Sequence, residues 1–295
     1  MAYTTTDLLS SIRQRGSIPT TTNTNNVNAT ANLLALATEE LHIKLLPLLM
    51  SVRAEFYVAA PYDQVITSNQ AAYPISTRAS GMVLRDVQII TGTDIASLPE
   101  IPSEQVRTTA TGTPTAYYFQ HNNVILYPTP SSTTGTLRQR YYMRPSRLAA
   151  TSACAQISAI DTGTSTVTVN AVPSSWATGT IVDFIAYTAP FQWRSTDATI
   201  SSVSGSDIVF SSLPTGLVVG DWIALAEYTP MPQIPFEFQP VLAQMTVVKA
   251  LEALGDEAGV KRAVSDLQIL QTNALHLITP RNHGEPKRVV PTTWR

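Results

Sequence analysis

The chain has 295 residues, a formal net charge of −2 and a single cysteine, Cys154. So small a net charge gives no overall field to draw the chain to nucleic acid or an anionic membrane, and one cysteine excludes a disulfide within the chain. Charged residues make up 14% of the chain, against roughly 25% in an average soluble domain, so uncharged side chains must supply much of the polar surface.

The N-terminal segment has no basic region followed by an apolar run, so the sequence predicts no signal peptide. The most apolar stretch, residues 41–58, also contains His, Lys, Arg, Glu and Pro, which makes it a poor membrane span. We therefore expect a soluble chain that is made in the cytoplasm.

A short helix is predicted over residues 7–15, where leucine and isoleucine form an apolar stripe. Thr6 or Asp7 is the expected N-terminal cap, and Gly16 is expected to end the helix.

A longer helix is predicted over residues 28–58, because leucine, alanine and valine recur there at spacings of three and four. Asn28 or Thr30 is its expected cap. Pro47 lies inside it and should kink the helix or start a new one, since proline has no N–H to donate.

The middle of the chain changes to extended patterns. A strand is predicted over residues 82–90, and a hairpin over 116–120 and 124–127 with its turn at 121–123. A further strand is predicted over 136–143.

Three arginines, Arg138, Arg140 and Arg144, alternate along this last strand and are expected to share one face. That face could contact DNA phosphates or pair with carboxylates of a neighbouring subunit.

Residues 153–226 contain an internal repeat with an offset of about 41 to 43 residues. Two similar β-meanders of this kind suit a small barrel or sandwich. We expect residues 151–228 to be a β domain inserted into the rest of the chain. The matched pairs are Ile157 with Ile200, Val167 with Ile208, Pro173 with Pro214, and Gly179 with Gly220.

Helices return at about residue 235. Gly255 is expected to end the first of them and Asp256 to cap the second, so that the two pack antiparallel. The predicted fold class is α+β, with a bundle formed by the N- and C-terminal helices, a β-rich middle, and an inserted small barrel or sandwich made of two repeats. Its predicted parts are a body of residues 1–150 and 229–279, the insertion 151–228, and an extended tail 280–295.

A search for reactive side chains finds no nucleotide-binding, zinc-protease or serine-hydrolase motif, and no cofactor is predicted. The histidines, His42, His121, His276 and His283, lack the local spacing of a helical metal site. Asp183 and Asp221 could form a carboxylate pair for glycan hydrolysis, but are more simply explained as acceptors for turn amides. We expect no enzymatic activity.

The C-terminal tail combines basic and apolar side chains, and tryptophan and arginine are favoured anchors at interfaces. The sequence therefore predicts that the tail docks on a neighbouring subunit or partner. The docking residues are Arg281, Lys287, Arg288, Val289, Val290, Trp294 and Arg295.

Five segments together resemble the head-to-tail connector, or adaptor, proteins of tailed bacteriophages. They read TDLLSSIRQRGSIP, LLPLLMSVRAEFYV, YPISTRASGMVLRDV, YYFQHNNVILYPTP and PQIPFEFQPVLAQMTVVKALEALGD, the last continuing to ITPRNHGEPKRVV. The repeat-bearing insertion is the part that matches this family least.

The resemblance implies a homo-oligomeric ring, commonly of twelve subunits, beneath the portal protein at the capsid vertex. Helices would surround the channel for genomic DNA, tail proteins would attach below, and a terminal arm would grip the portal or the next subunit. The implied location is the portal–tail junction of the virion. Alternatives are another tail or host-binding component whose repeat domain binds glycans, or an enzyme using Asp183 or Asp221.

Overall fold

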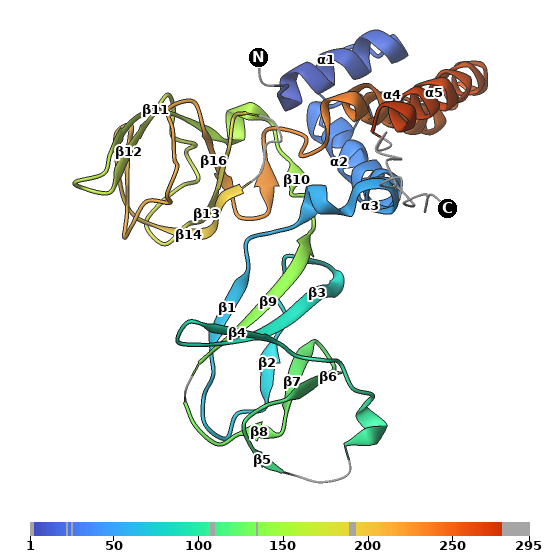
Figure 1. The fold of residues 1–295 in the computed structure, drawn as a ribbon. Coiled ribbons are helices and arrows are strands. Elements are labelled where there is room, and N and C mark those ends of the chain that lie inside the picture. Colours follow the sequence, from blue (N-terminus) through green and yellow to red (C-terminus); the bar gives the residue numbers. More distant parts are fainter. Residues whose placement is uncertain are drawn as a thin grey trace, which may run out of the picture. The chain divides into compact units, whose positions relative to one another are not determined.

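The structure is a computed structural model with helices in both end regions and a β-rich middle, the mixed α+β class predicted from the sequence (Figure 1). It divides into two compact units, residues 1–48 with 146–295 and residues 49–145, which are described separately. The predicted division into a body of residues 1–150 and 229–279 and an insertion of residues 151–228 stays a prediction. The described residues are 3–21, 23–24, 26–106, 110–133, 135–188 and 193–278.

Helix α1 (Thr5–Gly16) begins earlier than predicted, and its cap is Thr4. The Thr4 side chain accepts from the Asp7 backbone N–H at 3.4 Å, and the Thr4 N–H donates to the Asp7 carboxylate at 2.8 Å. The prediction of Thr6 or Asp7 as the cap is wrong because Asp7 is the third helical residue of this reciprocal capping box.

Helix α2 (Thr30–Glu40) follows Ala29, which makes no side-chain cap hydrogen bond, so neither Asn28 nor Thr30 caps it. The helix passes into a π turn (Leu41–Leu45) and then into α3 (Leu46–Arg53), which a 3₁₀ turn (Ala54–Tyr57) follows. The predicted break near Pro47 is thus present as a π turn that ends at Leu45, two residues before the proline, which has no N–H to donate to the helical ladder.

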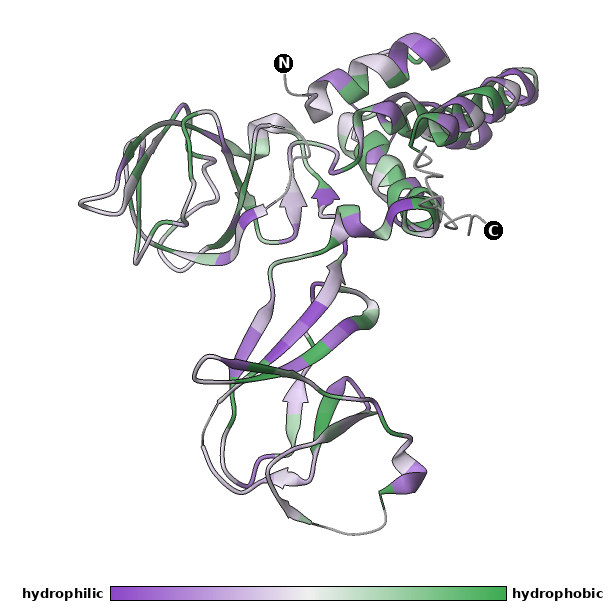
Figure 2. Ribbon diagram, in the orientation of Figure 1, coloured by the Kyte–Doolittle hydropathy of each residue, from purple (hydrophilic) through white to green (hydrophobic). Residues whose placement is uncertain are grey.

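Helices α4 (Gln239–Leu254) and α5 (Glu257–Ile278) form the predicted antiparallel hairpin. Gly255 ends α4 with φ of +75°, and Asp256 accepts from the Gly259 N–H at 2.9 Å. Helix α4 is buried along most of its length because α1, α2 and α5 all pack on it, so α4 is the centre of the helical body. Figure 2 shows hydrophobic and hydrophilic residues alternating along α5.

The unit of residues 49–145 contains small sheets. A four-stranded sheet has the order β1-β9-β3-β4, a three-stranded sheet has the order β2-β7-β6, and β5 pairs with β8. The hairpin β6–β7 turns at residues 121–122, one residue less than predicted, because Asn123 already pairs with Gln120. The strands are β1 (Tyr62–Val65), β2 (Ala72–Pro74), β3 (Ala79–Thr91), β4 (Asp94–Ser97), β5 (Thr111–Gly112), β6 (Ala116–Gln120), β7 (Asn123–Tyr127), β8 (Thr129–Pro130) and β9 (Thr136–Met143), with a 3₁₀ turn at Ser103–Gln105.

In the other unit, six strands close into a barrel with the order β11-β12-β15-β14-β13-β16 (Figure 1). Its interior is filled by side chains such as Phe184, Ile200 and Ile223, all fully buried. The strands are β11 (Ala155–Asp161), β12 (Thr166–Val169), β13 (Ile181–Ile185), β14 (Trp193–Ser204), β15 (Asp207–Phe210) and β16 (Trp222–Leu225). Shorter elements of this unit are β10 (Arg147–Leu148), β17 (Tyr228–Thr229), and 3₁₀ turns at Thr151–Ala153 and Phe236–Phe238.

Backbone hydrogen bonds in the barrel recur at matched positions. The Gly179 N–H donates to the Ile200 carbonyl at 2.8 Å, and the Gly220 N–H donates to the Ile157 carbonyl at 2.9 Å. Exchanging β11 with β14, β12 with β15 and β13 with β16 leaves every neighbour relation in the ring unchanged. Further matched bonds join Thr180 to Ala177 and Asp221 to Val218, and Val169 to Ser206 and Phe210 to Ser165.

Candidate binding groove

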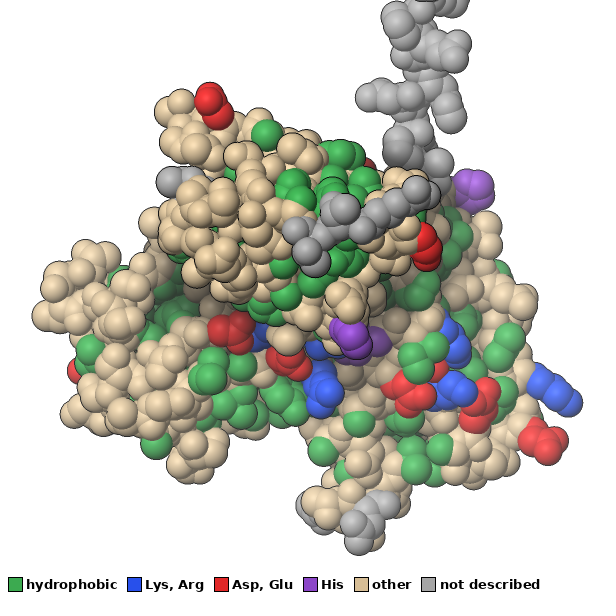
Figure 3. All heavy atoms as spheres, turned by 90° about the horizontal axis from the view of Figure 1, so that it is seen from below, with side chains coloured by type: hydrophobic (Ala, Val, Ile, Leu, Met, Phe, Trp, Pro, Cys, Tyr) green, Lys and Arg blue, Asp and Glu red, His purple; other side chains and the backbone are tan. Residues whose placement is uncertain are grey.

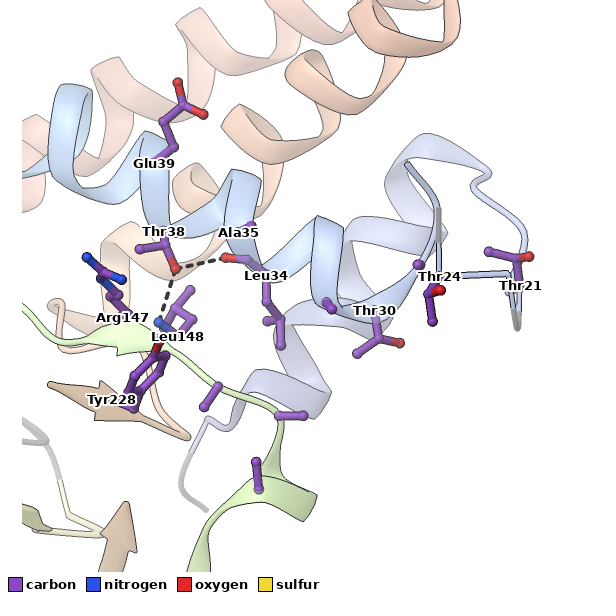
Figure 4. Close-up of a pocket in the computed structure, with 15 residues that line it drawn as sticks. Thr21, Thr24, Thr30, Leu34, Ala35, Thr38, Glu39, Arg147, Leu148 and Tyr228 are labelled. Carbon is purple, nitrogen blue, oxygen red and sulfur yellow. Dashed lines mark hydrogen bonds between the residues drawn. The ribbon is translucent and has the colours of Figure 1, made fainter. Parts of the chain in front are cut away.

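A groove of about 820 Å³ lies beside α2 in the unit of residues 1–48 and 146–295 (Figure 4). One side is α2 with the loop that precedes it, and the other is the segment 147–153 with Tyr228 from β17. Most of the lining surface is apolar. The lining residues are Thr21, Thr24, Ala29, Thr30, Ala31, Leu34, Ala35, Thr38, Glu39, Arg147, Leu148, Ala149, Ala150, Ala153 and Tyr228.

Hydrogen bonds hold the two sides in place. The Thr38 hydroxyl donates to the Leu34 carbonyl at 2.8 Å and accepts from the Leu148 N–H at 3.0 Å, which ties α2 to β10 (Figure 4). The Thr5 hydroxyl donates to the Ala149 carbonyl at 2.7 Å. These bonds connect the segment 147–153 to α2 and to α1.

The groove has the chemistry of a site for apolar groups. Six of its lining residues are alanines, whose small side chains leave room for large ones. The charged side chains, Glu39 and Arg147, are both exposed, and Figure 4 shows the Glu39 carboxylate directed away from Leu148. The lining therefore suits an apolar group better than a charged one.

The predicted docking residues of the tail, Arg281, Lys287, Arg288, Val289, Val290, Trp294 and Arg295, all lie outside the described residues. Residue His283 lies outside them as well. The groove is a feature that sequence reasoning missed.

Arg138 is paired within its own unit. Its guanidinium donates two hydrogen bonds, at 2.8 and 2.7 Å, to the two carboxylate oxygens of Asp63 on β1. These hydrogen bonds hold the pKa of Asp63 below its ordinary value, although desolvation opposes them. The contact is the carboxylate pairing considered from the sequence, but the carboxylate belongs to this chain and not to a neighbour.

The other two arginines lie at different depths. Arg140 lies on the same half-buried face of β9 as Arg138, opposite Asp86 of β3. Arg144 directly follows the end of the strand and is exposed, so the common face is shown for Arg138 and Arg140 and stays a prediction for Arg144. A contact with DNA stays a prediction.

The carboxylates Asp183 and Asp221 are fully buried and act as acceptors within the barrel. Asp183 accepts from the Asp197 and Glu227 N–H groups, both at 2.9 Å. Asp221 accepts from the Tyr187 N–H at 3.0 Å, the Val218 N–H at 3.1 Å and the Arg194 Nε at 3.2 Å. These are the amide contacts that the simpler sequence interpretation predicted.

The described histidines lie on three different elements. His42 lies on the π turn, His121 in the β6–β7 turn and His276 in the last turn of α5. Within the described ranges, no group of three or more His, Cys, Asp or Glu residues could hold a metal ion, and no helix there is both long and apolar enough to cross a membrane.

Comparison with known protein families gives no family model that matches the chain. Comparison with curated proteins likewise gives no match.

Proposed function

We propose that this chain is a structural adaptor that links the portal at the capsid vertex to the tail of a tailed phage, as one subunit of a ring around the DNA channel. The portal protein, tail proteins and further copies of the chain are its proposed partners. The proposal rests on the resemblance carried by the five segments quoted above and on the surface of the helical body.

The observation that carries the proposal is the apolar exposure of the helices. On α5, Ile269 is 58% exposed and Leu277 is 66% exposed. They are eight residues apart, a spacing that places them on the same side of a helix, about 12 Å apart along its axis. Leu254 at the end of α4 is 46% exposed. Helices that leave large aliphatic side chains in water suit lateral packing between identical subunits.

The polar surface supports the same function. Figure 3 shows a face on which uncharged polar side chains and backbone together cover the widest area, beside patches of hydrophobic side chains and a smaller number of charged ones. Uncharged surface costs less to desolvate than charged surface, so it favours packing against neighbours. A weak net field also suits a channel that DNA must pass through without sticking.

The barrel is proposed to be a module formed by duplication of a three-stranded unit and inserted into the body. The matched hydrogen bonds at Gly179 and Gly220 support this proposal. In an adaptor, the module would project from the ring and leave ring closure to the helices.

Electron microscopy of the protein mixed with its candidate portal tests the adaptor function. The unaltered chain is expected to form rings on the portal, and the double variant Ile269→Asp with Leu277→Asp is expected to lose them while staying folded. Val65→Asp is the matched control, because Val65 is 69% exposed but lies on β1 in the other unit. Absence of any ring or portal complex with the unaltered chain would refute the proposal.

A further inference from the structure

We infer that the groove beside α2 receives the exposed side of helix α5 from a second copy of the chain, with the two helices antiparallel. This contact rests on the proposed ring and names the two surfaces that join its subunits. Both surfaces belong to the unit of residues 1–48 and 146–295. Because they differ from one another, the contact is heterologous, which is the kind of contact that closes a ring.

The open side of α2 is a narrow stripe of mostly small side chains. Its exposed residues are Ala31, Ala35 and Glu39, which recur at a spacing of four and so lie along one side of the helix. All three line the groove. Because two of them are alanines, a second helix can approach α2 closely, within the roughly 8–10 Å that separates packed helix axes.

The open side of α5 is a longer stripe with charged residues at one end and aliphatic residues toward the other. Its members are exposed and recur three or four residues apart, so they share one side of the helix. They are Arg262, Asp266, Ile269, Asn273 and Leu277. The two aliphatic side chains are more than half exposed, so an apolar groove on a neighbour would remove them from water.

The groove is divided in the same way as the α5 stripe. Figure 4 shows Glu39 and Arg147 toward one end of the groove and Thr30 toward the other. An antiparallel α5 therefore brings Arg262 to Glu39. Asp266, one turn further on, then meets Arg147, so each rim charge gains a partner of opposite sign. In the described part of the chain, none of these four charged side chains forms an ion pair of its own.

The spacings along the two helices agree with this register. At a rise of about 1.5 Å per residue, Ala31 lies about 12 Å from Glu39 along α2, and Ile269 lies about 10.5 Å from Arg262 along α5. When Arg262 meets Glu39, Ile269 is therefore level with the alanine stripe. Leu277 lies about 12 Å further along α5, which takes it toward the loop that precedes α2 at the other end of the groove.

The test mixes two single-cysteine forms of the full-length chain, Ala35→Cys and Ser265→Cys, with the candidate portal. Ala35 lies in the groove, and Ser265 is exposed on α5 next to Asp266, so neither change removes a charge or an aliphatic group from the contact. A short bismaleimide reagent should join these two chains at least about ten times faster than it joins Ala35→Cys to the control Ser206→Cys. Ser206 is exposed in the turn between β14 and β15 of the same unit. The native Cys154 does not compete, since burial raises the pKa of its thiol to about 12.

Charge reversal tests the register. Glu39→Arg in the Ala35→Cys chain should slow the cross-link about fivefold, because two arginines then face each other. Arg262→Glu in the Ser265→Cys chain should slow it by a similar factor. The two reversals together should restore the rate to within about twofold. Lys261→Glu is the matched control, because Lys261 is exposed beside Arg262 but lies off the stripe, and it should leave the rate unchanged.

The outcomes separate this contact from the adaptor function. Rings in electron micrographs without the cross-link would overturn the contact and leave the adaptor proposal standing. Linking of Ala35→Cys chains to one another would also overturn it, because the contact would then be symmetric. The cross-link without rings on the portal would support the contact and count against the adaptor, and absence of both would refute both.

Discussion

Val167 on β12 and Ile208 on β15 lie directly opposite each other in the barrel, and they are also one of the matched pairs of the repeat predicted from the sequence. Both side chains are fully buried. The two predicted repeat copies therefore meet where β12 pairs with β15, and the two side chains fill one shared region of the core.

This relation predicts the outcome of an exchange. The double variant Val167→Ile with Ile208→Val keeps the summed volume, so it should cost less than about 1.5 kcal/mol. Ile208→Ala alone leaves a cavity and should cost about 2 to 5 kcal/mol. Chemical denaturation followed by barrel-specific fluorescence measures both, and an exchange as costly as the alanine variant would contradict the equivalence.

Substitutions at the matched loop positions Asp221 and Thr180 are predicted to have unequal effects on stability. Asp221 accepts from the Val218 N–H, and at the equivalent position Thr180 accepts from the Ala177 N–H at 3.0 Å. Asp221→Ala leaves three donors without their acceptor and should cost about 3 kcal/mol, whereas Thr180→Ala should cost about 1 kcal/mol. Thermal unfolding of the two variants compares them, and equal losses would show that the extra contacts of Asp221 contribute nothing.

Cys154 is predicted to be unreactive in the folded chain. It is 5% exposed, and burial raises the pKa of its thiol from 9.0 to about 12. Burial of the neutral thiol therefore stabilises the fold below pH 9, and this contribution is lost as the pH rises toward the folded pKa of about 12. The thiolate is the reactive form of cysteine, and almost none of it is present at pH 8 in the folded chain. A chromogenic disulfide reagent at pH 8 should therefore modify the native protein far more slowly than the denatured protein. A Val219→Cys variant, exposed on the barrel, gives the fast reference rate.

The first helix is predicted to depend on its cap. Thr4→Ala removes one half of the capping box with Asp7 and should lower the free energy of unfolding of the helical body by about 1 kcal/mol. Ser10→Ala is the control, because Ser10 is exposed within the same helix and the change should be neutral. Urea denaturation followed by circular dichroism separates the two variants.

The pair of Asp63 and Arg138 predicts an acid-sensitive contribution to the stability of residues 49–145. Because the pKa of Asp63 is lowered from 3.8 by its hydrogen bonds to Arg138, the contribution is present above pH 3.8 and is lost as the pH falls through the folded value. The effect should be small, since Asp63 is largely exposed. Asp63→Asn should remove this part of the pH dependence, and Asp94→Asn, on the exposed strand β4, should leave it unchanged.

Local patterns predicted much of this fold. The strand over 136–143 and the end of α4 at Gly255 were both visible in the sequence, because alternation and glycine placement are decided over a few residues. The caps were harder, because Thr4 and Asp7 satisfy each other and residue preference alone does not say which of several neighbouring threonines does so.

The groove could not be predicted, because its walls come from distant parts of the chain. Thr38 and Leu148 are 110 residues apart and are joined by one hydrogen bond. A spacing of four between Ala31 and Ala35 hinted at a helix face with small side chains. No local pattern could show that Ala149 and Ala150 lie across from it.

The parallel pairing of β10 with β17 places Arg147 beside Tyr228 and Leu148 beside Thr229. The polypeptide thus enters and leaves the barrel region through adjacent strands, which lie roughly 4.8 Å apart in a sheet. If the barrel is the insertion proposed above, a different domain could replace it between these two strands while Arg147 and Tyr228 keep their pairing.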